Sequence, residues 1–384
     1  MKILHAIRQG EFGGGETHVM DLVKGMQYSF YESFVVAFSE GQMVEELRLM
    51  GVPVFVIHTK SPFDISVWQK VGQIIKDNNI NILHAHGTRA FSNTFYSAKR
   101  LSIPVIYTVH GWSFHADQNK IVRWFRKKSE GFLISKANTT VFVSEANSKE
   151  GKTYYGNFNS VIIRNGIDHT KFNVDGLQGK LREELSVSDN TFLLGFIARI
   201  TKQKNLISLL NAIALLPKEY DIKLIIAGDG DLKEEMEKKT KELDIADKTI
   251  FLNYRSDIRN ILNSIDVYCL PSLWEGLSIG LLEAMSMRKA VIVSDIETNT
   301  EVVKHMYNGF VSRPSAEELG AGISTLYKSR ALREKLATNA YKTILEEFQL
   351  EMMVEKVKSV YSALNNRKEH IDTEHIDSRK TIAL

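Results

Sequence analysis

Short runs of β-branched and aliphatic residues alternate with amphipathic helical patterns along this chain, and the series begins twice. In the first half we expect strands at residues 2–7, 34–38, 54–57, 82–84, 105–109, 140–143 and 161–163. In the second half we expect them at residues 192–198, 222–227, 249–252, 267–270 and 290–293. Strands that alternate with helices predict parallel sheets covered by helices on both faces. The chain is therefore expected to contain two α/β domains.

The length agrees with two domains. A chain of 384 residues exceeds one ordinary hydrophobic core and fits two domains of about 170 to 190 residues. We place the first at residues 1–168 and the second at residues 169–349, separated by the turn-rich stretch 165–173 and the polar segment 175–190. Beyond residue 316 the pattern predicts only helices, at residues 317–328, 331–346 and 350–364, followed by a flexible polar tail at 365–384.

Composition favours a cytoplasmic protein. No apolar run approaches the roughly 18 residues of a membrane-spanning helix, and residues 1–7 have the pattern of a strand and not of a secretory signal. The single cysteine, Cys269, excludes an intramolecular disulfide. Because it lies in an apolar strand, a buried bystander explains it better than a nucleophile does.

The net charge of +3 conceals a local excess of basic residues. Residues 1–168 contain 19 Lys and Arg against 14 Asp and Glu, and five of these bases lie within nine residues that begin at Lys120. Ile121, Trp124, Phe125 and Phe132 recur at helical spacing on one side of the same segment. A basic helix with aromatic residues predicts attachment to an anionic membrane surface, although a solvated helix with an ordinary apolar face is an equal alternative. Nucleic acid is disfavoured, because no basic stripe with interleaved aromatics recurs elsewhere.

Two glutamates lie eight positions apart around the end of the predicted strand at 267–270. Glu275 falls in the loop after this strand, and Glu283 falls in the second turn of a helix that should begin at about Ser278. Ligands of parallel sheets bind at the carboxyl ends of the strands, and the amides of Gly276, Leu277 and Ser278 near a helix N-terminus suit an anionic group. A ligand with hydroxyls and phosphates would use both carboxylates as acceptors and the amides as donors.

Three further motifs follow predicted strands. Arg199 and Lys204 follow the first strand of the second half and could neutralise a diphosphate leaving group without a metal. Bases at a helix start run against the helix dipole, which favours an anionic ligand there. Gly14 and Gly15 follow the first strand and would let backbone amides approach a phosphate or sugar, although a tight connection explains them equally well. His110 ends the strand at 105–109, at the edge where ligands bind.

Two patterns could be metal sites. Asp229 and Asp231 form a D-x-D pattern, but between a strand and a helix we favour a turn in which Asp231 is the helix N-cap. His84 and His86 share one side of a strand, and without a third ligand we favour packing and cleft lining. We expect no metal and no other cofactor.

Taken in their order along the chain, these motifs strongly resemble those of the retaining glycosyltransferases of family 4 (glycosyl transferases group 1), which have the GT-B fold. The resemblance covers roughly residues 1–364 and includes the E-x7-E pair and the R-x4-K spacing. It implies two Rossmann-like, doubly wound domains that face each other across a cleft. The first would bind the acceptor and the second the donor, and a final helix at about 350–364 would cross back to the first domain.

The resemblance also implies an activity and residue roles. The enzyme would be a retaining, metal-independent hexosyltransferase that uses a UDP- or GDP-linked sugar and a hydroxyl acceptor, in polysaccharide or glycolipid assembly. Glu275 and His110 would orient the sugar, and Arg199 and Lys204 would stabilise the leaving diphosphate. Glu283 would hold the ribose. The other donor-binding residues that we take from the resemblance are Gly276, Leu277, Ser278, Gly14, Gly15, Glu145, Asn165, Tyr254 and Arg255, the last two near backbone that reads the base.

The chain departs from the family pattern at two places. Glu297–Thr–Asn–Thr–Glu301 stands where relatives often have a Gly-Gly pair, and Ser278 stands where proline is common. The sugar and the geometry of the acceptor therefore stay open. Two alternatives also stay open: a nucleotide-sugar 2-epimerase or glycosyl phosphorylase, and a non-catalytic partner subunit that binds nucleotide sugar.

Overall fold

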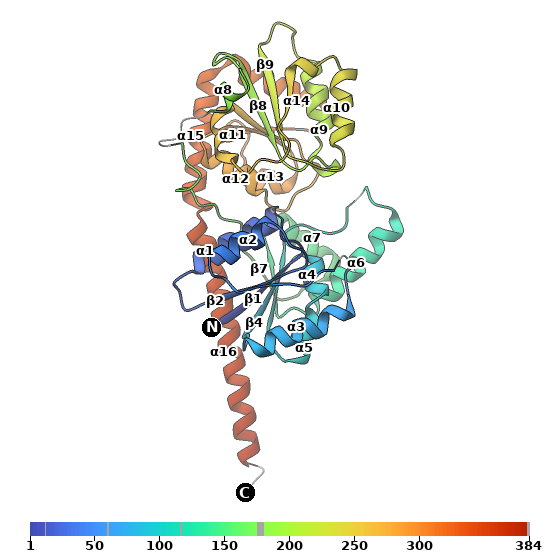
Figure 1. Cartoon of the computed structure of the whole chain (residues 1–384), viewed down its shortest axis with the longest axis vertical. Coiled ribbons are helices and arrows are strands. Elements are labelled where there is room, and N and C mark those ends of the chain that lie inside the picture. Colours follow the sequence, from blue (N-terminus) through green and yellow to red (C-terminus); the bar gives the residue numbers. More distant parts are fainter. Residues whose placement is uncertain (12, 60, 116, 175–179, 382–384) are drawn as a thin grey trace. The chain divides into compact units, whose positions relative to one another are not determined.

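The chain forms two compact units. The computed structural model describes residues 1–381 apart from residues 12, 60, 116 and 175–179, so that part of the polar segment predicted at 175–190 and the end of the predicted tail at 382–384 lie outside the described residues. Unit 1 is formed by Met1–Asn165 together with the chain from Leu350 onward, and unit 2 is formed by Gly166–Gln349 (Figure 1).

Unit 1 is built on a parallel sheet of seven strands in the order β3-β2-β1-β4-β5-β6-β7. The strands are β1 (Lys2–Ile7), β2 (Glu32–Ala37), β3 (Val54–Val56), β4 (Ile82–His86), β5 (Val105–Val109), β6 (Thr139–Phe142) and β7 (Ser160–Ile162). All seven strands predicted for this half are present. The strand order reverses between β1 and β4, and such a switch point is where open α/β sheets bind their ligands.

Helices cover both faces of this sheet. One face carries α1 (Gly14–Met26), α2 (Gln42–Leu49) and α16 (Leu350–Thr381), whose apolar side chains pack on Ile3, Ile7 and Ile82. The opposite face, on which Leu4 and Ala6 lie, carries α3 (Ile65–Asp77), α4 (Thr88–Ser92), α5 (Phe95–Arg100) and α6 (Lys120–Ile134). The helix α7 (Glu145–Tyr155) connects β6 and β7. Because successive strand residues point to opposite faces, this alternation accounts for the apolar cores on both faces of the sheet.

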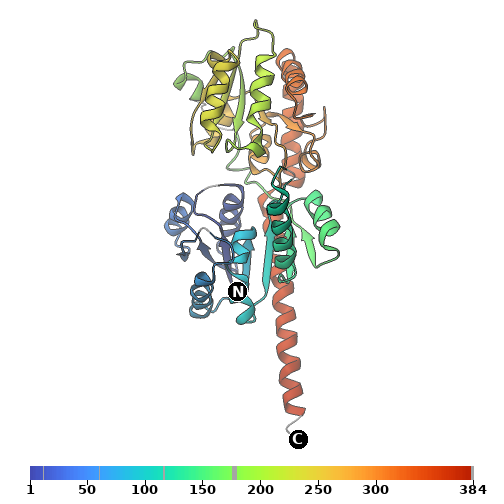
Figure 2. The same ribbon diagram turned by 90° about the vertical axis from the view of Figure 1, so that its right-hand side faces the viewer.

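The last helix, α16, packs on unit 1 although it follows unit 2 in the sequence. Figure 1 and Figure 2 both show it beside the sheet of unit 1. It approaches α1 so closely that a Cβ at Gly25 would lie 2.5 Å from a methyl group of Val354. The helix continues to Thr381, through most of the segment for which a flexible tail was expected. That segment contains neither glycine nor proline, so nothing in it interrupts the helix.

Unit 2 repeats the architecture with six parallel strands in the order β10-β9-β8-β11-β12-β13. The strands are β8 (Phe192–Ile197), β9 (Ile222–Ala227), β10 (Thr249–Phe251), β11 (Val267–Leu270), β12 (Ala290–Ser294) and β13 (Phe310–Ser312). The first five match the predicted strands, whereas β13 was not predicted. The switch point lies between β8 and β11.

The helices of unit 2 also cover two faces. Side chains of α9 (Leu206–Ala214) and α14 (Ala316–Lys328) join the apolar core that includes Phe192, Leu194 and Phe196 of β8. On β11 and β12 lie α12 (Ile279–Ser286) and α15 (Arg330–Glu347), which pack on each other. The remaining helices are α8 (Leu181–Glu184), α10 (Lys233–Glu242), α11 (Ile258–Ser264), α13 (Glu297–Val302) and the 3-10 turns η1 (Lys202–Lys204) and η2 (Ala246–Lys248).

Candidate functional site

The strongest concentration of predicted residues lies at the switch point of unit 2. Lys204 ends η1, in the loop after β8, and Glu275 lies in the loop after β11. The Nζ atom of Lys204 lies 2.5 Å from Oε1 of Glu275, and the two side chains are 18% and 6% exposed. Adjacent strands thus bring together two residues that are 71 positions apart in the chain.

Hydrogen bonds hold the Glu275 carboxylate in place. The Ser272 hydroxyl donates to Oε1 at 2.7 Å, and Gln203 Nε2 lies 3.4 Å from Oε2. Gln203 also donates to the Trp274 carbonyl at 2.8 Å, which ties the β8 loop to the β11 loop. Because an ammonium group has three donors, Lys204 keeps capacity for an anionic ligand while it contacts Glu275.

Arg199 lies exposed in the same β8 loop, and its backbone is supported by the turn after β9. A Cβ at Gly228, where φ is +146°, would lie 2.1 Å from the Ala198 carbonyl oxygen. A Cβ at Gly230 would lie 2.3 Å from the Ile200 carbonyl oxygen, and Ile200 N donates to Asp229 O at 2.9 Å. The glycines around the D-x-D pattern are therefore required for close packing of two loops.

The prediction that Asp231 caps the following helix was wrong. The N-cap of α10 is Leu232, with no side-chain hydrogen bond to the cap. Lys233 N donates to Gly230 O at 3.1 Å, so a turn extends past Asp231 and the helix starts later.

The start of α12 agrees with the prediction. Ser278 is its N-cap, and the Ser278 hydroxyl accepts from Leu281 N at 3.4 Å. Gly276 and Leu277 precede it in the loop after β11, and Leu277 is buried. Glu283 lies within α12, one turn beyond its start.

A buried tyrosine that the sequence reasoning missed lies beneath these residues. Tyr268 belongs to β11, and its hydroxyl lies 3.5 Å from the Ile197 carbonyl at the end of β8. Burial raises the pKa of this hydroxyl well above its usual range, and the charges of Glu275 and Glu283 raise the pKa further. Both glutamates of the E-x7-E pair therefore act on the same phenol. Cys269, beside it in the strand, is also buried, which raises the pKa of its thiol to about 12 and agrees with a bystander role.

Tyr254 and Arg255 follow β10, at the same edge of the sheet. Tyr254 is exposed, whereas the Arg255 guanidinium donates to Glu184 at 2.5 Å and to Asp257 at 2.6 Å. The hydrogen bond from Arg255 lowers the pKa of Asp257 to about 2. Because the guanidinium is already paired with these two carboxylates, we expect Arg255 to contact a ligand only through its backbone.

In unit 1, the structure brings Gly15 and His110 together. Gly15 lies in the first turn of α1, and a Cβ there would lie 3.5 Å from Cδ2 of His110, which follows β5. A Cβ at Gly14 would meet no atom within 4 Å, so packing in this unit does not require glycine at that position.

The other two predicted residues of unit 1 lie in different surroundings. Asn165 is buried, and its Oδ1 lies 3.0 Å from Nδ1 of His18 in α1. Glu145 starts α7, is largely exposed and accepts from Arg164 at 2.9 Å.

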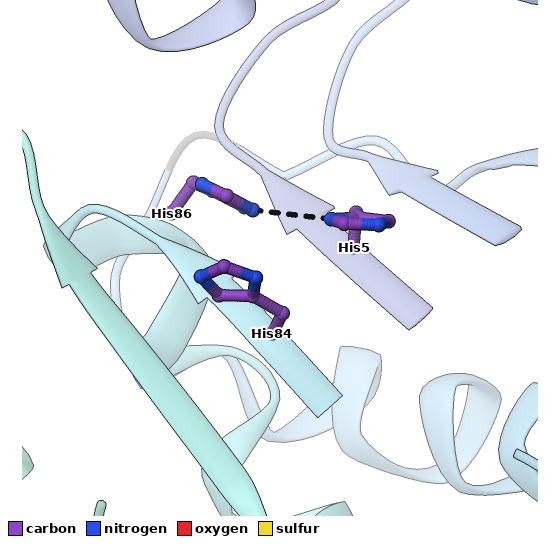
Figure 3. A group of neighbouring side chains, drawn as sticks. All are labelled: His5, His84 and His86. Carbon is purple, nitrogen blue, oxygen red and sulfur yellow. Dashed lines mark hydrogen bonds between the residues drawn. The ribbon is translucent and has the colours of Figure 1, made fainter. Parts of the chain in front are cut away.

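Five histidines gather on the face of the sheet beneath α1 and α16, and four of them are fully buried: His5, His18, His84 and His86, with His110 half-buried. His5 pairs with His84 in the register of β1 and β4 (Figure 3). Burial lowers the pKa of all five, to about 3 for His5 and about 4 for His18. The imidazoles are therefore neutral at pH 7. Sequence reasoning missed His5 and His18, because only strand register and helix docking bring them to the others.

Two trios of these histidines could hold a metal ion, so a third imidazole does exist beside His84 and His86. In the first trio, with His5, both ring nitrogens of His84 already have partners: Nδ1 lies 2.6 Å from the Tyr361 hydroxyl and Nε2 lies 2.7 Å from the Thr108 hydroxyl. In the second trio, His18, His86 and His110, the His86 and His110 rings are hydrogen-bonded to each other at 3.2 Å. An ion would have to displace these bonds.

The predicted basic helix is α6, and the first part of its apolar side is exposed, whereas Phe132 packs against Phe95. Ile121 is 67% exposed, Trp124 54% and Phe125 62%, whereas the helix is anchored on unit 1 through Leu133 and Ile134. In the part of the chain that the structure describes, no helix is both long enough and apolar enough to cross a membrane.

Comparison with known proteins agrees with this architecture. The model of Glycosyltransferase Family 4 matches residues 12–171, and that of Glycosyl transferases group 1 matches residues 178–343. The chain is 26% identical over 328 residues to the UDP-Gal:alpha-D-GlcNAc-diphosphoundecaprenol alpha-1,3-galactosyltransferase of Escherichia coli, which covers 83% of this chain and 84% of that protein. It is also 26% identical over 346 residues to the N,N'-diacetylbacillosaminyl-diphospho-undecaprenol alpha-1,3-N-acetylgalactosaminyltransferase of Campylobacter jejuni, covering 85% and 90% of the two chains.

Solved structures show the same fold. Anabaena Alr3699/HepE in complex with UDP-glucose superimposes with a TM-score of 0.83 at 21% identity, over 94% of this chain and all of that chain (100%). WaaG, a glycosyltransferase involved in lipopolysaccharide biosynthesis, superimposes with a TM-score of 0.74 at 14% identity, over 94% and 99% of the two chains. The chain therefore belongs to the family 4 glycosyltransferases and has the GT-B fold.

Proposed function

We propose that this glycosyltransferase is a retaining enzyme that transfers a hexose from a nucleotide-diphosphate sugar to a hydroxyl of a lipid-linked acceptor, in glycolipid or polysaccharide assembly. The observation that carries the proposal is the pairing of Lys204 with Glu275 at the switch point of unit 2. It puts a cation for the diphosphate and an acceptor for sugar hydroxyls within one hydrogen bond of each other.

In this proposal the donor lies over the carboxyl ends of β8 and β11. Arg199 and Lys204 neutralise the diphosphate, and the positive charge that other enzymes obtain from a metal comes from these two side chains. The amides before α12 add donors near the helix N-terminus, since Ser278 caps the helix. Glu275 accepts from the sugar and Glu283 from the ribose.

The proposed chemistry keeps the configuration of the sugar. The acceptor oxygen attacks the anomeric carbon from the face that the diphosphate leaves. The bond from that carbon to the phosphate oxygen breaks, and the acceptor proton passes to a phosphate oxygen of the leaving group. The protein supplies position and charge.

The names of the relatives support the substrate classes. The Escherichia coli relative is named for a UDP-linked galactose and an undecaprenol diphosphate acceptor, and the Campylobacter jejuni relative is also named for an undecaprenol-linked acceptor. The Anabaena structures contain UDP, UDP with glucose, and UDP-glucose. We therefore place a UDP-linked donor first among the candidates.

A lipid-linked acceptor requires contact with a membrane surface, and α6 supports this part of the proposal. The exposed Ile121, Trp124 and Phe125 lie on a helix that also carries five bases between Lys120 and Lys128. Aromatic and aliphatic side chains enter the interface, while bases attract anionic lipid headgroups. The enzyme would attach peripherally to the inner face of the membrane.

The test is the thermal stability of the full chain with a panel of UDP-, GDP-, ADP- and TDP-sugars, each with and without EDTA. We expect one nucleotide to raise the melting temperature in both conditions. Lys204→Ala should abolish the shift, and Lys202→Ala, which removes an exposed lysine two positions away, should retain it. No shift with any nucleotide sugar would reject the proposed donor site. Epimerisation of the sugar without an acceptor would favour the epimerase, and donor binding with neither transfer nor slow hydrolysis would favour the non-catalytic subunit.

A further inference from the structure

Three histidines of unit 1 form a continuous hydrogen-bonded chain that ends at the carboxyl edge of the sheet. Nδ1 of His5 lies 3.3 Å from Nε2 of His86 (Figure 3), and Nδ1 of His86 lies 3.2 Å from Nε2 of His110. We call His5, His86 and His110 the histidine chain. His84, whose ring lies 4.1 Å from that of His86, takes no part, because Tyr361 and Thr108 occupy both of its nitrogens.

The hydrogen bonds of the histidine chain must all point the same way. A neutral imidazole has one N–H donor and one nitrogen lone pair, so each ring that donates at one nitrogen must accept at the other. Burial keeps the three rings neutral by lowering the pKa of each. Either the protons point outward from His5 to His110, which leaves His110 with its N–H at Nδ1, or they point inward and leave His5 with an N–H at Nε2.

The inner end of the chain decides between the two directions. Nε2 of His5 is buried and has no hydrogen-bond partner among the described residues. The inward arrangement would leave an N–H there, and the outward arrangement leaves only a lone pair. A buried N–H without a partner is rarer in proteins than an acceptor without one. The outward direction is therefore favoured.

We infer that His5 and His86 are positioning residues that hold His110 in the Nδ1–H tautomer, so that His110 presents a hydrogen-bond donor at the edge of the sheet. The ring of His110 lies beside the first turn of α1, since a Cβ at Gly15 would lie 3.5 Å from its Cδ2. This tautomer does not depend on the proposed function, because the hydrogen bonds that set it lie within unit 1.

Nitrogen NMR of the histidine rings tests the inference on the ligand-free full chain. With 15N-labelled histidine, long-range proton–nitrogen correlations distinguish a protonated ring nitrogen from one with a lone pair, and His110→Gln identifies the His110 signals. We expect His110 to be protonated at Nδ1, which is not the tautomer that free histidine side chains prefer. Protonation of His110 at Nε2 in the unmodified protein would overturn the inference.

Variants then test whether His86 sets the tautomer of His110. In His86→Leu, His110 should revert to the Nε2–H tautomer, whereas the exposed His58→Leu should leave the His110 signals unchanged. Circular dichroism confirms that each variant is folded, and His5→Gln is the second variant if His86→Leu is not. An unchanged His110 tautomer in a folded His86→Leu protein would refute the role of the histidine chain.

The NMR result is also independent of the proposed function. If neither UDP nor UDP-glucose binds the unmodified protein, the donor proposal fails, whereas the expected tautomer of His110 stays the same.

Discussion

Acidification should destabilise unit 1 because of its buried histidines. A histidine that is held neutral in the folded state but takes up a proton when unfolded makes unfolding easier as the pH falls. The folded pKa of His5 is about 3 and that of His18 about 4, against 6.5 for the ordinary side chain. Their full contribution to stability is therefore present above pH 6.5 and is lost between pH 6.5 and about pH 3.

The magnitude follows from the same values. Between pH 7 and pH 5 the unfolded chain takes up nearly one proton for each of these two histidines, which lowers the free energy of unfolding by about 2 kcal/mol per histidine. Burial lowers the pKa of His84, His86 and His110 as well, so they act in the same direction. A loss of about 4 kcal/mol or more is a large part of a typical stability of 5 to 15 kcal/mol.

One buried group in unit 1 opposes this effect. Burial raises the pKa of Glu130, which accepts from Thr88, Ser113 and Tyr107. The folded state therefore takes up a proton at Glu130 sooner than the unfolded chain does. One carboxyl group takes up at most one proton, so it cannot offset the destabilisation caused by proton uptake at five histidines.

Urea unfolding monitored by tryptophan fluorescence measures the loss. Trp274 is the sole tryptophan of unit 2, so Trp274→Phe confines the signal to unit 1. We expect the free energy of unfolding to fall by at least about 4 kcal/mol from pH 7 to pH 5. His5→Phe should reduce this fall by about 2 kcal/mol, and the exposed His58→Phe should not change it. A fall of less than about 1 kcal/mol would refute the conclusion that these imidazoles stay neutral.

Three further predictions concern ligands and membranes. Gly14→Ala should stabilise unit 1 by about 0.5 kcal/mol, because the added methyl group meets no atom within 4 Å, yet it should weaken nucleotide-sugar binding if the loop approaches the ligand. Thermal melts with and without ligand check both parts, and unchanged affinity would remove Gly14 from the site. Glu283→Ala should weaken donor binding by one to two factors of ten, since each of two hydrogen bonds is worth ~1.5 kcal/mol. Titration calorimetry with the donor that the thermal-stability panel identifies measures this affinity, and an unchanged value would contradict the role of Glu283. Trp124→Ala with Phe125→Ala should weaken binding to anionic phosphatidylglycerol vesicles, measured by sedimentation, by about a hundredfold or more, at about 1.5 kcal/mol or more per side chain. Equal sedimentation of both proteins would exclude α6 as the membrane contact.

The parts of the fold that depend on local pattern were predictable. Val267–Leu270 is a buried strand because it is an uninterrupted apolar run, and Ser278 caps the next helix because a serine precedes an apolar helical pattern. The positions of Glu275 in the loop after that strand and of Glu283 in the next helix were predictable from the same pattern. By contrast, β13 has only three residues, too few for a period to show.

The parts that depend on distant contacts were not predictable. His5 and His86 meet because β1 and β4 pair in one register, and His18 reaches them only when α1 docks on the sheet. The ion pair of Lys204 with Glu275 likewise needs β8 beside β11. No local spacing encodes a strand order. The prediction of an Asp231 cap was wrong at a turn that is bonded to a distant loop: Ile200 N donates to Asp229 O, and Leu232 N donates to Ile200 O.

The position of α16 has a consequence for synthesis of the chain. Ile3, Ile82, Ile106 and Val141 of unit 1 are covered by the last helix, whose Tyr361 is made 196 residues after Asn165. At about 5 to 20 residues per second, the ribosome needs roughly 10 to 40 s to reach it. During that time unit 2 can complete its own core, while an apolar face of unit 1 stays uncovered. The first half of the protein is thus the last to finish folding, and its exposed sheet is the surface that a chaperone would protect.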